Sequence, residues 1–98
     1  MSEQTSIWFL YVIRTAKQSL YTGITTDVQR RLRQHQNNKG AKHLKGHQDL
    51  KVVYQVKVGG RSLALKLEYR IKHLSKKDKE ALIIQSPDLN NLLKLLDK

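Results

Sequence analysis

Two apolar segments near the start of the chain have the composition of β-strands. Residues 7–13 are seven consecutive apolar residues, most of them β-branched or aromatic, which favours a strand over a helix. Because this run does not alternate with polar residues, we expect a central strand with helices packed over both of its faces. Residues 14–18 would form a turn, and residues 19–24 would form a second strand antiparallel to the first.

A helix and a third strand are predicted next. Thr26 has the position of a helix N-cap, and Gln29 three residues later would complete a capping box. This helix would run to about Asn38 and end at Gly40, where a basic loop begins. Residues 50–58 alternate loosely between apolar and polar, which predicts a half-buried strand that a glycine pair ends.

The last third of the chain has the apolar spacing of three helices. Ser62 would cap a helix over residues 63–74, and Ser75 would cap another that ends near Ile84. Ser86 and the proline after it would open a fourth helix with a stripe of leucines. Those leucines would either close the core or form the seam of a homodimer.

The element order ββαβααα indicates an α+β fold. We expect a small three-stranded antiparallel sheet flanked by helices, in a single domain over residues 1–98. Its core would cover about residues 7–84, and its C-terminal helix about residues 87–97. A chain of this length builds one modest core, so no second domain is predicted.

The net charge of the chain indicates which kind of molecule it binds. The chain holds 19 Lys and Arg against 8 Asp and Glu, a net charge of +11, which favours a polyanion and above all nucleic acid. A ribosomal surface, an anionic lipid or no specific partner stay open on charge alone. The absence of cysteine excludes disulfides and a thiolate zinc site. The sequence has neither a membrane-spanning segment nor the pattern of a signal peptide, so we expect a cytoplasmic protein with no membrane partner.

One arginine of the first predicted helix lies where a substrate phosphate could reach it. Val28 and Leu32 are four residues apart and define the buried stripe of that helix. Arg31 and His35 fall beside this stripe on one flank, whereas Arg30 falls on the solvent side. The planar guanidinium of Arg31 suits a phosphate, and an ion pair with a nearby carboxylate is the structural alternative.

Two tyrosines lie on the paired strands. Tyr11 and Tyr21 oppose one another on the same face of the sheet if the connecting loop has three or five residues, and lie on different faces if it has four. Joint chemistry requires the odd loop, so we predict it. Taken alone, each tyrosine would be a core residue with a hydrogen-bonded hydroxyl. Gly23 marks either a bulge or a place where a substrate approaches the backbone.

Glu68 is the most informative of the few acids. It lies at the border of the apolar stripe of the second predicted helix, one turn after Ala64. A carboxylate there is either a surface residue or a group that projects into a basic cleft and holds a divalent cation. Mg²⁺ commonly uses one or two carboxylates and completes its coordination with water and phosphate oxygens.

Together these residues resemble the motifs of the GIY-YIG nuclease superfamily, and most closely its small single-domain bacterial members. The resemblance covers about residues 7–84 in a ββαβα frame. It rests on two short motifs and three single residues in a fixed order, namely Leu10-Tyr11-Val12, Tyr21-Thr22-Gly23, Arg31, His35 and Glu68.

The resemblance implies a role for each of these side chains. Glu68 would bind a single Mg²⁺ or Mn²⁺ ion, and Tyr21 or Tyr11 would deprotonate or orient the attacking water. Arg31 would stabilise the negative charge that develops on the phosphate. His35 would hydrogen-bond a tyrosine or the phosphate.

Contacts with nucleic acid are predicted around this site. The resemblance implies that Gly23 keeps the floor of the site open for the substrate. Cationic side chains would contact backbone phosphates without reading the bases, and we assign this role to Arg30, Lys42, Lys45, Lys76, Lys77 and Lys79.

We therefore expect a divalent-metal-dependent nuclease that hydrolyses phosphodiester bonds of nucleic acid, DNA above all, with little sequence specificity. The resemblance suggests a role in DNA repair or processing, with a repair protein or a second copy of the chain as partner. Two alternatives keep the fold without the reaction: a non-catalytic nucleic-acid-binding module and a protein-interaction adaptor. The joint presence of two phenols, Arg31 and Glu68 favours the enzyme, because an adaptor has no chemical need for all four.

Overall fold

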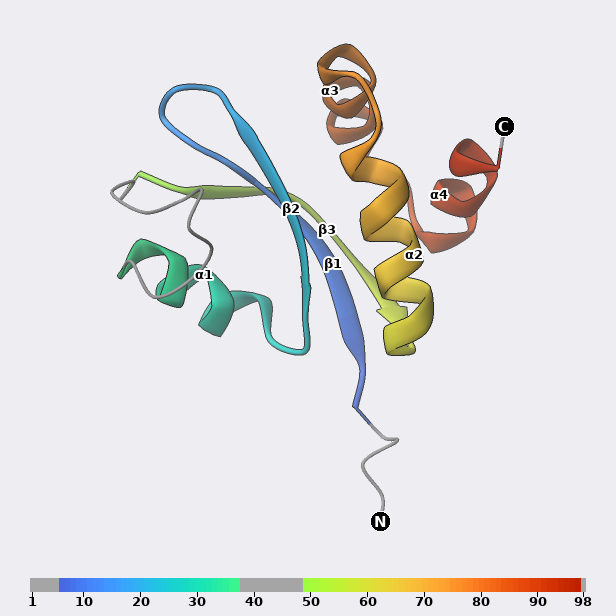
Figure 1. Ribbon diagram of the computed structural model, residues 1–98, viewed down its shortest axis with the longest axis horizontal. Coiled ribbons are helices and arrows are strands. Elements are labelled where there is room, and N and C mark those ends of the chain that lie inside the picture. Colours follow the sequence, from blue (N-terminus) through green and yellow to red (C-terminus); the bar gives the residue numbers. More distant parts are fainter. Residues whose placement is uncertain (1–5, 38–48, 98) are drawn as a thin grey trace.

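The computed structural model describes residues 6–37 and 49–97, and its elements follow the predicted order (Figure 1). The strands form one antiparallel sheet in the order β2-β1-β3, which confirms the predicted α+β fold. In chain order the elements are β1 Trp8–Arg14, β2 Leu20–Thr25, α1 Val28–Gln36, β3 Lys51–Gly59, α2 Arg61–Lys72, α3 Lys76–Gln85 and α4 Leu89–Leu96.

The central strand β1 separates two cores. Leu10 and Val12 face a core to which α2, α3 and α4 contribute apolar side chains. Tyr11 and Ile13 face the other way, toward a smaller cluster that includes Val28 of α1. Figure 1 shows the same division, with α1 on one side of the sheet and α2 on the other. This position explains the unbroken apolar run of β1, since both of its faces are buried.

The loop between β1 and β2 spans residues 15–19, and so has the odd length that the two tyrosines require. Thr15 and Ser19 close it with a backbone hydrogen bond of 3.0 Å and a hydrogen bond of 2.7 Å between their hydroxyls. Gln18 adopts the left-handed region at φ 69°, which helps the chain to reverse within so short a loop.

The register of this hairpin differs from the predicted one. Tyr11 pairs with Gly23 and Tyr21 pairs with Ile13, so the two tyrosines are diagonal neighbours rather than directly opposed. They still share a face of the sheet, because Tyr11 and Ile13 are two residues apart on β1. The pairing is shifted because the loop starts after Arg14, one residue later than predicted.

The caps of α1 and α2 differ from the predicted ones. Asp27 caps α1, since its carboxylate accepts a hydrogen bond of 3.0 Å from the backbone N–H of Arg30, and the predicted Thr26 cap is wrong. A carboxylate is the stronger acceptor at a helix start, where the helix dipole also favours a negative charge. The helix α2 begins directly after Gly60 without a side-chain cap, so the predicted Ser62 cap is wrong as well.

The cap of α3 is the predicted one, and the cap of α4 is not. Ser75 caps α3 as predicted and accepts a hydrogen bond of 3.1 Å from the backbone N–H of Asp78. Ser86 does not open α4, because it ends α3 in the left-handed region at φ 46°. Asp88 caps α4 instead.

The leucine stripe of α4 closes the larger core. Leu92 and Leu96 are buried there together with residues of α2 and α3. The Tyr54 hydroxyl of β3 donates a hydrogen bond of 2.7 Å to the Pro87 carbonyl, which ties the start of this segment to the sheet. The homodimer stays a prediction.

Some predictions concern residues that the structure does not describe. The basic loop with Lys42 and Lys45 falls within residues 38–48, outside the described ranges. The first helix ends at Gln36 with Asn37 as its C-cap, so the predicted end at Gly40 is wrong. The single domain over residues 1–98 stays a prediction. Within the described ranges, no helix is long and apolar enough to cross a membrane.

Candidate active site

Tyr11 crosses from the central strand β1 over the edge strand β2. Its pairing partner is Gly23, and a Cβ atom at Gly23 would lie 2.6 Å from the phenol oxygen. Because glycine lacks that atom, the ring of Tyr11 fits across β2. The pairing of β1 with β2 runs past this point without a shift, so the bulge interpretation of Gly23 is wrong. In the structure the protein's own phenol, rather than a substrate, is what approaches this backbone.

His35 lies against the hydroxyl of Tyr11. The phenol oxygen is 3.0 Å from Nε2 of His35, and both residues are 1% exposed. Burial, and then the charge of Arg31, lower the pKa of His35 from 6.5 to about 4. The imidazole is therefore neutral at neutral pH. Its Nε2 can accept a hydrogen bond from the phenol O–H when Nδ1 carries the ring proton. A tyrosine is one of the two partners that the resemblance implied for His35.

The pKa of Tyr11 reports on the groups that surround it. Burial, and then the phenol of Tyr21, raise this pKa from 10.0 to about 12. A hydrogen bond and the charge of Arg31 act in the opposite direction, and the charge of Glu68 raises the pKa slightly further. Groups from β2, α1 and α2 therefore lie within electrostatic reach of one phenol.

Arg31 is held by a neighbour on its own helix. Its guanidinium donates a hydrogen bond of 2.8 Å to Oε1 of Gln34. We did not predict a role for Gln34, although a spacing of three residues on a helix brings two side chains together. The guanidinium has five N–H donors, and the contact with Gln34 uses one nitrogen of the group. A phosphate oxygen is a suitable acceptor for the others.

Tyr21 lies half-buried on the edge strand, between residues of both helices. Its ring centroid is 6.4 Å from that of Tyr11 and meets the imidazole of His35 edge-on at 5.3 Å. On its other side, Nζ of Lys72 lies 6.0 Å from the ring centroid. Tyr21 therefore connects the α1 side of the site to α2.

Glu68 reaches the site from α2, which covers the opposite face of the sheet. Its carboxylate lies 3.2 Å from Nζ of Lys72, and its side chain is 19% exposed. Because the same Lys72 ammonium lies over the ring of Tyr21, Glu68 is at the β2 edge and not on the outer surface of α2. The spacing of four residues between Glu68 and Lys72 predicts such a pair on a helix, but we did not draw that conclusion from the sequence.

The donors at this site suit one kind of metal ion. Among the described residues, no group of three or more His, Asp or Glu side chains could enclose an ion. Glu68 offers a single carboxylate beside groups that suit a phosphate. This set fits Mg²⁺ or Mn²⁺, since Mg²⁺ commonly takes one or two carboxylates and obtains its other ligands from water and phosphate.

The cationic side chains around the site have different surroundings. Arg30 is exposed on α1, as predicted. Lys76 is engaged within the protein, because its ammonium donates to the Gln18 carbonyl and lies 3.6 Å from the Glu80 carboxylate. Its side chain is nevertheless 56% exposed, so its contact with phosphate stays a prediction. Lys77 is exposed on α3.

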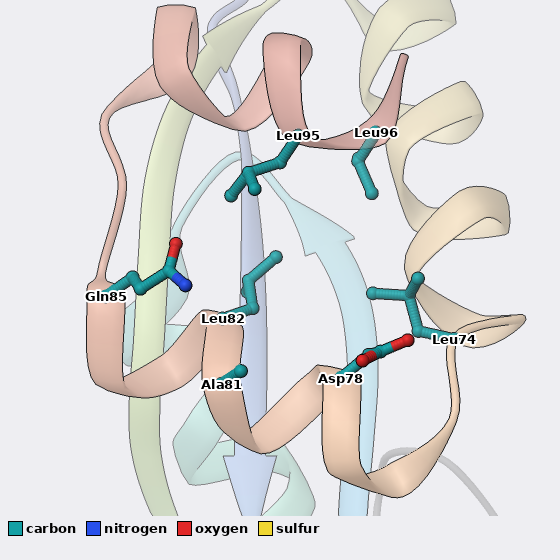
Figure 2. Close-up of a pocket in the computed structure, with 7 residues that line it drawn as sticks. All are labelled: Leu74, Asp78, Ala81, Leu82, Gln85, Leu95 and Leu96. Carbon is teal, nitrogen blue, oxygen red and sulfur yellow. The ribbon is translucent and has the colours of Figure 1, made fainter. Parts of the chain in front are cut away.

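A pocket of about 200 Å³ between α3 and α4 is a separate feature (Figure 2). It is lined mainly by leucines and contains none of the five predicted catalytic side chains. Its lining residues are Leu74, Asp78, Ala81, Leu82, Gln85, Leu95 and Leu96. The pocket therefore adds nothing to the candidate active site.

Comparison with known proteins identifies the family. Residues 7–81 match the model of the GIY-YIG catalytic domain. The chain belongs to the GIY-YIG family. The matched range contains Tyr11, Tyr21, Arg31, His35 and Glu68, and the resemblance that these residues carried is confirmed at the level of the family. GIY-YIG proteins form a nuclease superfamily that acts on nucleic acid.

Relatives within the GIY-YIG family are bacterial and of similar length. UPF0213 proteins of Yersinia pestis and Yersinia pseudotuberculosis are 60% identical over 84 residues, which are 86% of this chain and 88% of theirs. The solution structure of a UPF0213 protein from Bacillus halodurans has a TM-score of 0.54 and 35% identity. That similarity covers 81% of this chain and 84% of the other.

Proposed function

We propose that this GIY-YIG protein is a divalent-metal-dependent nuclease that hydrolyses phosphodiester bonds of nucleic acid, DNA above all. One observation carries the proposal: a guanidinium, a second phenol and a carboxylate from different elements all lie within electrostatic reach of one phenol. These groups belong to Tyr11, Tyr21, Arg31 and Glu68. Family membership supports the same class of reaction.

Arg31 is the group that binds the scissile phosphate and stabilises the charge that develops on it. Its contact with Gln34 limits the rotation of the guanidinium, so fewer conformations are lost when a phosphate binds. A fixed positive charge in a partly buried site acts more strongly on the transition state than the same charge in water.

The two tyrosines have different roles in this proposal. Tyr11 is 1% exposed and its pKa is raised to about 12, which makes it a poor base at neutral pH. Its hydroxyl contacts His35 and acts as a positioning group. Tyr21 is more exposed and lies between Tyr11 and Lys72, so it is the phenol that contacts and orients the attacking water.

Glu68 is the protein ligand for the divalent cation. A bound Mg²⁺ or Mn²⁺ would supply positive charge and polarise the phosphate oxygens. Lys72 neutralises Glu68 at 3.2 Å and is itself about half exposed, so it can swing away from the carboxylate. In that position its ammonium is free to meet the substrate backbone.

The proposed specificity follows from the charge of the chain. A net charge of +11 supports binding through the phosphate backbone, which carries little sequence information. The exposed Arg30 and Lys77 lie on the two sides of the sheet and suit such contacts. A role in DNA repair, with a repair protein or a second copy of the chain as partner, remains part of the proposal.

The test is cleavage of labelled DNA with Mg²⁺, with Mn²⁺ or with EDTA. The variants are Tyr21→Phe, Arg31→Ala and Glu68→Gln, and the matched control is Arg33→Ala, which removes an exposed arginine from the same helix. We expect the three site variants to lose about 100-fold or more of the rate, as is typical when a transition-state contact is removed. The control should stay within about threefold of the wild-type rate.

Each result decides between the functions considered. Metal-dependent cleavage that the three variants lose supports the nuclease. Binding that survives EDTA, with no cleavage under either cation, would favour the non-catalytic module. Wild-type rates in all three site variants would place the reaction elsewhere.

A further inference from the structure

An exposed aromatic side chain lies next to the carboxylate of the candidate site. Tyr69 follows Glu68 on α2 and is 63% exposed; among the described residues it is the one aromatic side chain in the group of exposed large hydrophobic residues. Its ring contacts the imidazole of His73, with centroids 4.3 Å apart and the two planes tilted by 39°. We call Tyr69 and His73 the Tyr69 platform.

The packing of α2 does not account for this platform. The helix buries Ala64, Leu67 and Ile71 against the sheet. Successive residues are 100° apart around a helix, so Tyr69 projects on the side opposite these three. His73 is fixed there by a contact of 2.8 Å between its Nδ1 and the Tyr69 carbonyl. The Tyr69 ring, which is 63% exposed and is held against the tilted imidazole of His73, is therefore available to a ligand in solvent.

The surroundings of the platform are cationic. Lys66 and Arg70 line an open hollow of about 490 Å³ together with Leu65 and Tyr69. Both cations are exposed. The only acid on the helix is Glu68, which is paired with Lys72. An aromatic face among positive charges complements a nucleic acid, whose bases stack on rings while its phosphates attract cations.

The platform is continuous with the candidate active site. Around the circumference of α2, helical geometry places Glu68, Lys72, Leu65 and Tyr69 in that order. Lys72 joins the two regions, since its ammonium lies over the ring of Tyr21 and 3.2 Å from the Glu68 carboxylate. A strand whose phosphate lies at Arg31 and Glu68 can therefore continue past Lys72 to Tyr69.

We propose that the Tyr69 platform stacks an unpaired base beside the scissile phosphate. This inference rests on the proposed nuclease function and specifies its substrate class: nucleic acid with single-stranded nucleotides next to the cleavage point, as in flaps, overhangs and loops. In a duplex the base faces are covered by their neighbours, so a side chain can stack only on a base that has left the helix or never entered one.

The test is equilibrium binding in EDTA, so that cleavage does not interfere. The probes are a fluorescein-labelled oligothymidylate, an oligouridylate and a DNA duplex of equal length. Tyr69→Ala should weaken binding of the single strands about tenfold, the typical effect of losing one stacked base, and leave duplex binding within about twofold. Tyr69→Phe keeps the ring and should bind like the wild type. Ile84→Ala removes an exposed apolar side chain from α3 and is the matched control.

The outcomes separate this inference from the proposed function. Unchanged single-strand binding by Tyr69→Ala, in a protein that still cleaves nucleic acid, would overturn the platform alone. An equal loss on single strands and duplex would overturn it too, because the contact would then be general. A wild-type protein that neither binds nor cleaves any probe would remove the nuclease proposal as well.

A larger effect on the oligouridylate than on the oligothymidylate would assign the platform to RNA, and the reverse would assign it to DNA. Thermal melting followed by circular dichroism verifies that each variant is folded.

Discussion

At the scale of single residues, the buried imidazole of His35 has a consequence for stability. Its pKa is about 4 in the folded chain against 6.5 for a free histidine, so the unfolded chain binds the additional proton first as the pH falls. Stability should therefore fall from about pH 7 to pH 4, by up to about 3 kcal/mol, and level off below. The measurement is urea unfolding at several pH values, with His35→Gln as a variant that keeps an acceptor but cannot titrate. Parallel curves for the two proteins would contradict the prediction.

The residues of the candidate active site were easier to name from the sequence than the contacts that they make. Tyr11, Tyr21 and Arg31 were singled out through the resemblance of their motifs to the GIY-YIG family, and their catalytic roles stay predictions. The sequence did not show why position 23 is a glycine. The residue that pairs with Gly23 is set by the hairpin register, and the register depends on where a loop of five residues starts. Lys72 could have been found, since a lysine four residues after Glu68 is an ordinary helical ion pair.

At the scale of elements, the start of α1 controls how Arg31 and His35 are presented. Asp27 caps this helix, whereas Thr26 does not. Asp27→Ala should lower the free energy of unfolding by about 1 kcal/mol, because the carboxylate contact with an amide of the first turn is lost. Thr26→Ala is the matched control and should change stability by less than about 0.5 kcal/mol. Urea denaturation compares the two, and an equal loss in both variants would show that the cap is shared.

The element types could be predicted because their hydrophobic periods are clear. The strand order β2-β1-β3 agrees with the expected central position of β1, because β2 takes one edge of β1 as its hairpin partner and leaves the other edge to β3. Helix starts were predicted less well, because several Ser, Thr and Asp residues near each boundary can act as caps. At α4, Ser86 and Asp88 compete, and the left-handed conformation of Ser86 leaves the cap to Asp88.

At the scale of the whole molecule, the net charge of +11 predicts that the proposed binding of nucleic acid depends on the salt concentration. If four phosphates are contacted, the affinity should fall about 100-fold as the salt concentration rises from about 50 to about 200 mM, because each contact releases a counterion. Fluorescence anisotropy with one labelled oligonucleotide over a salt series measures the slope. A change below about threefold would mean that contacts other than phosphate contacts dominate.

Four of the five side chains of the candidate site lie within the continuous segment from β1 to α1, and only Glu68 comes from α2, across the sheet. The segment from β1 to α1 can attract a phosphate on its own, because it carries the guanidinium and both phenols. The acid joins it only when α2 is packed onto its core through Leu67 and Ile71. In the proposed nuclease, the metal ligand is therefore in place only when α2 is packed against the sheet. The proposed reaction would thus require the complete fold.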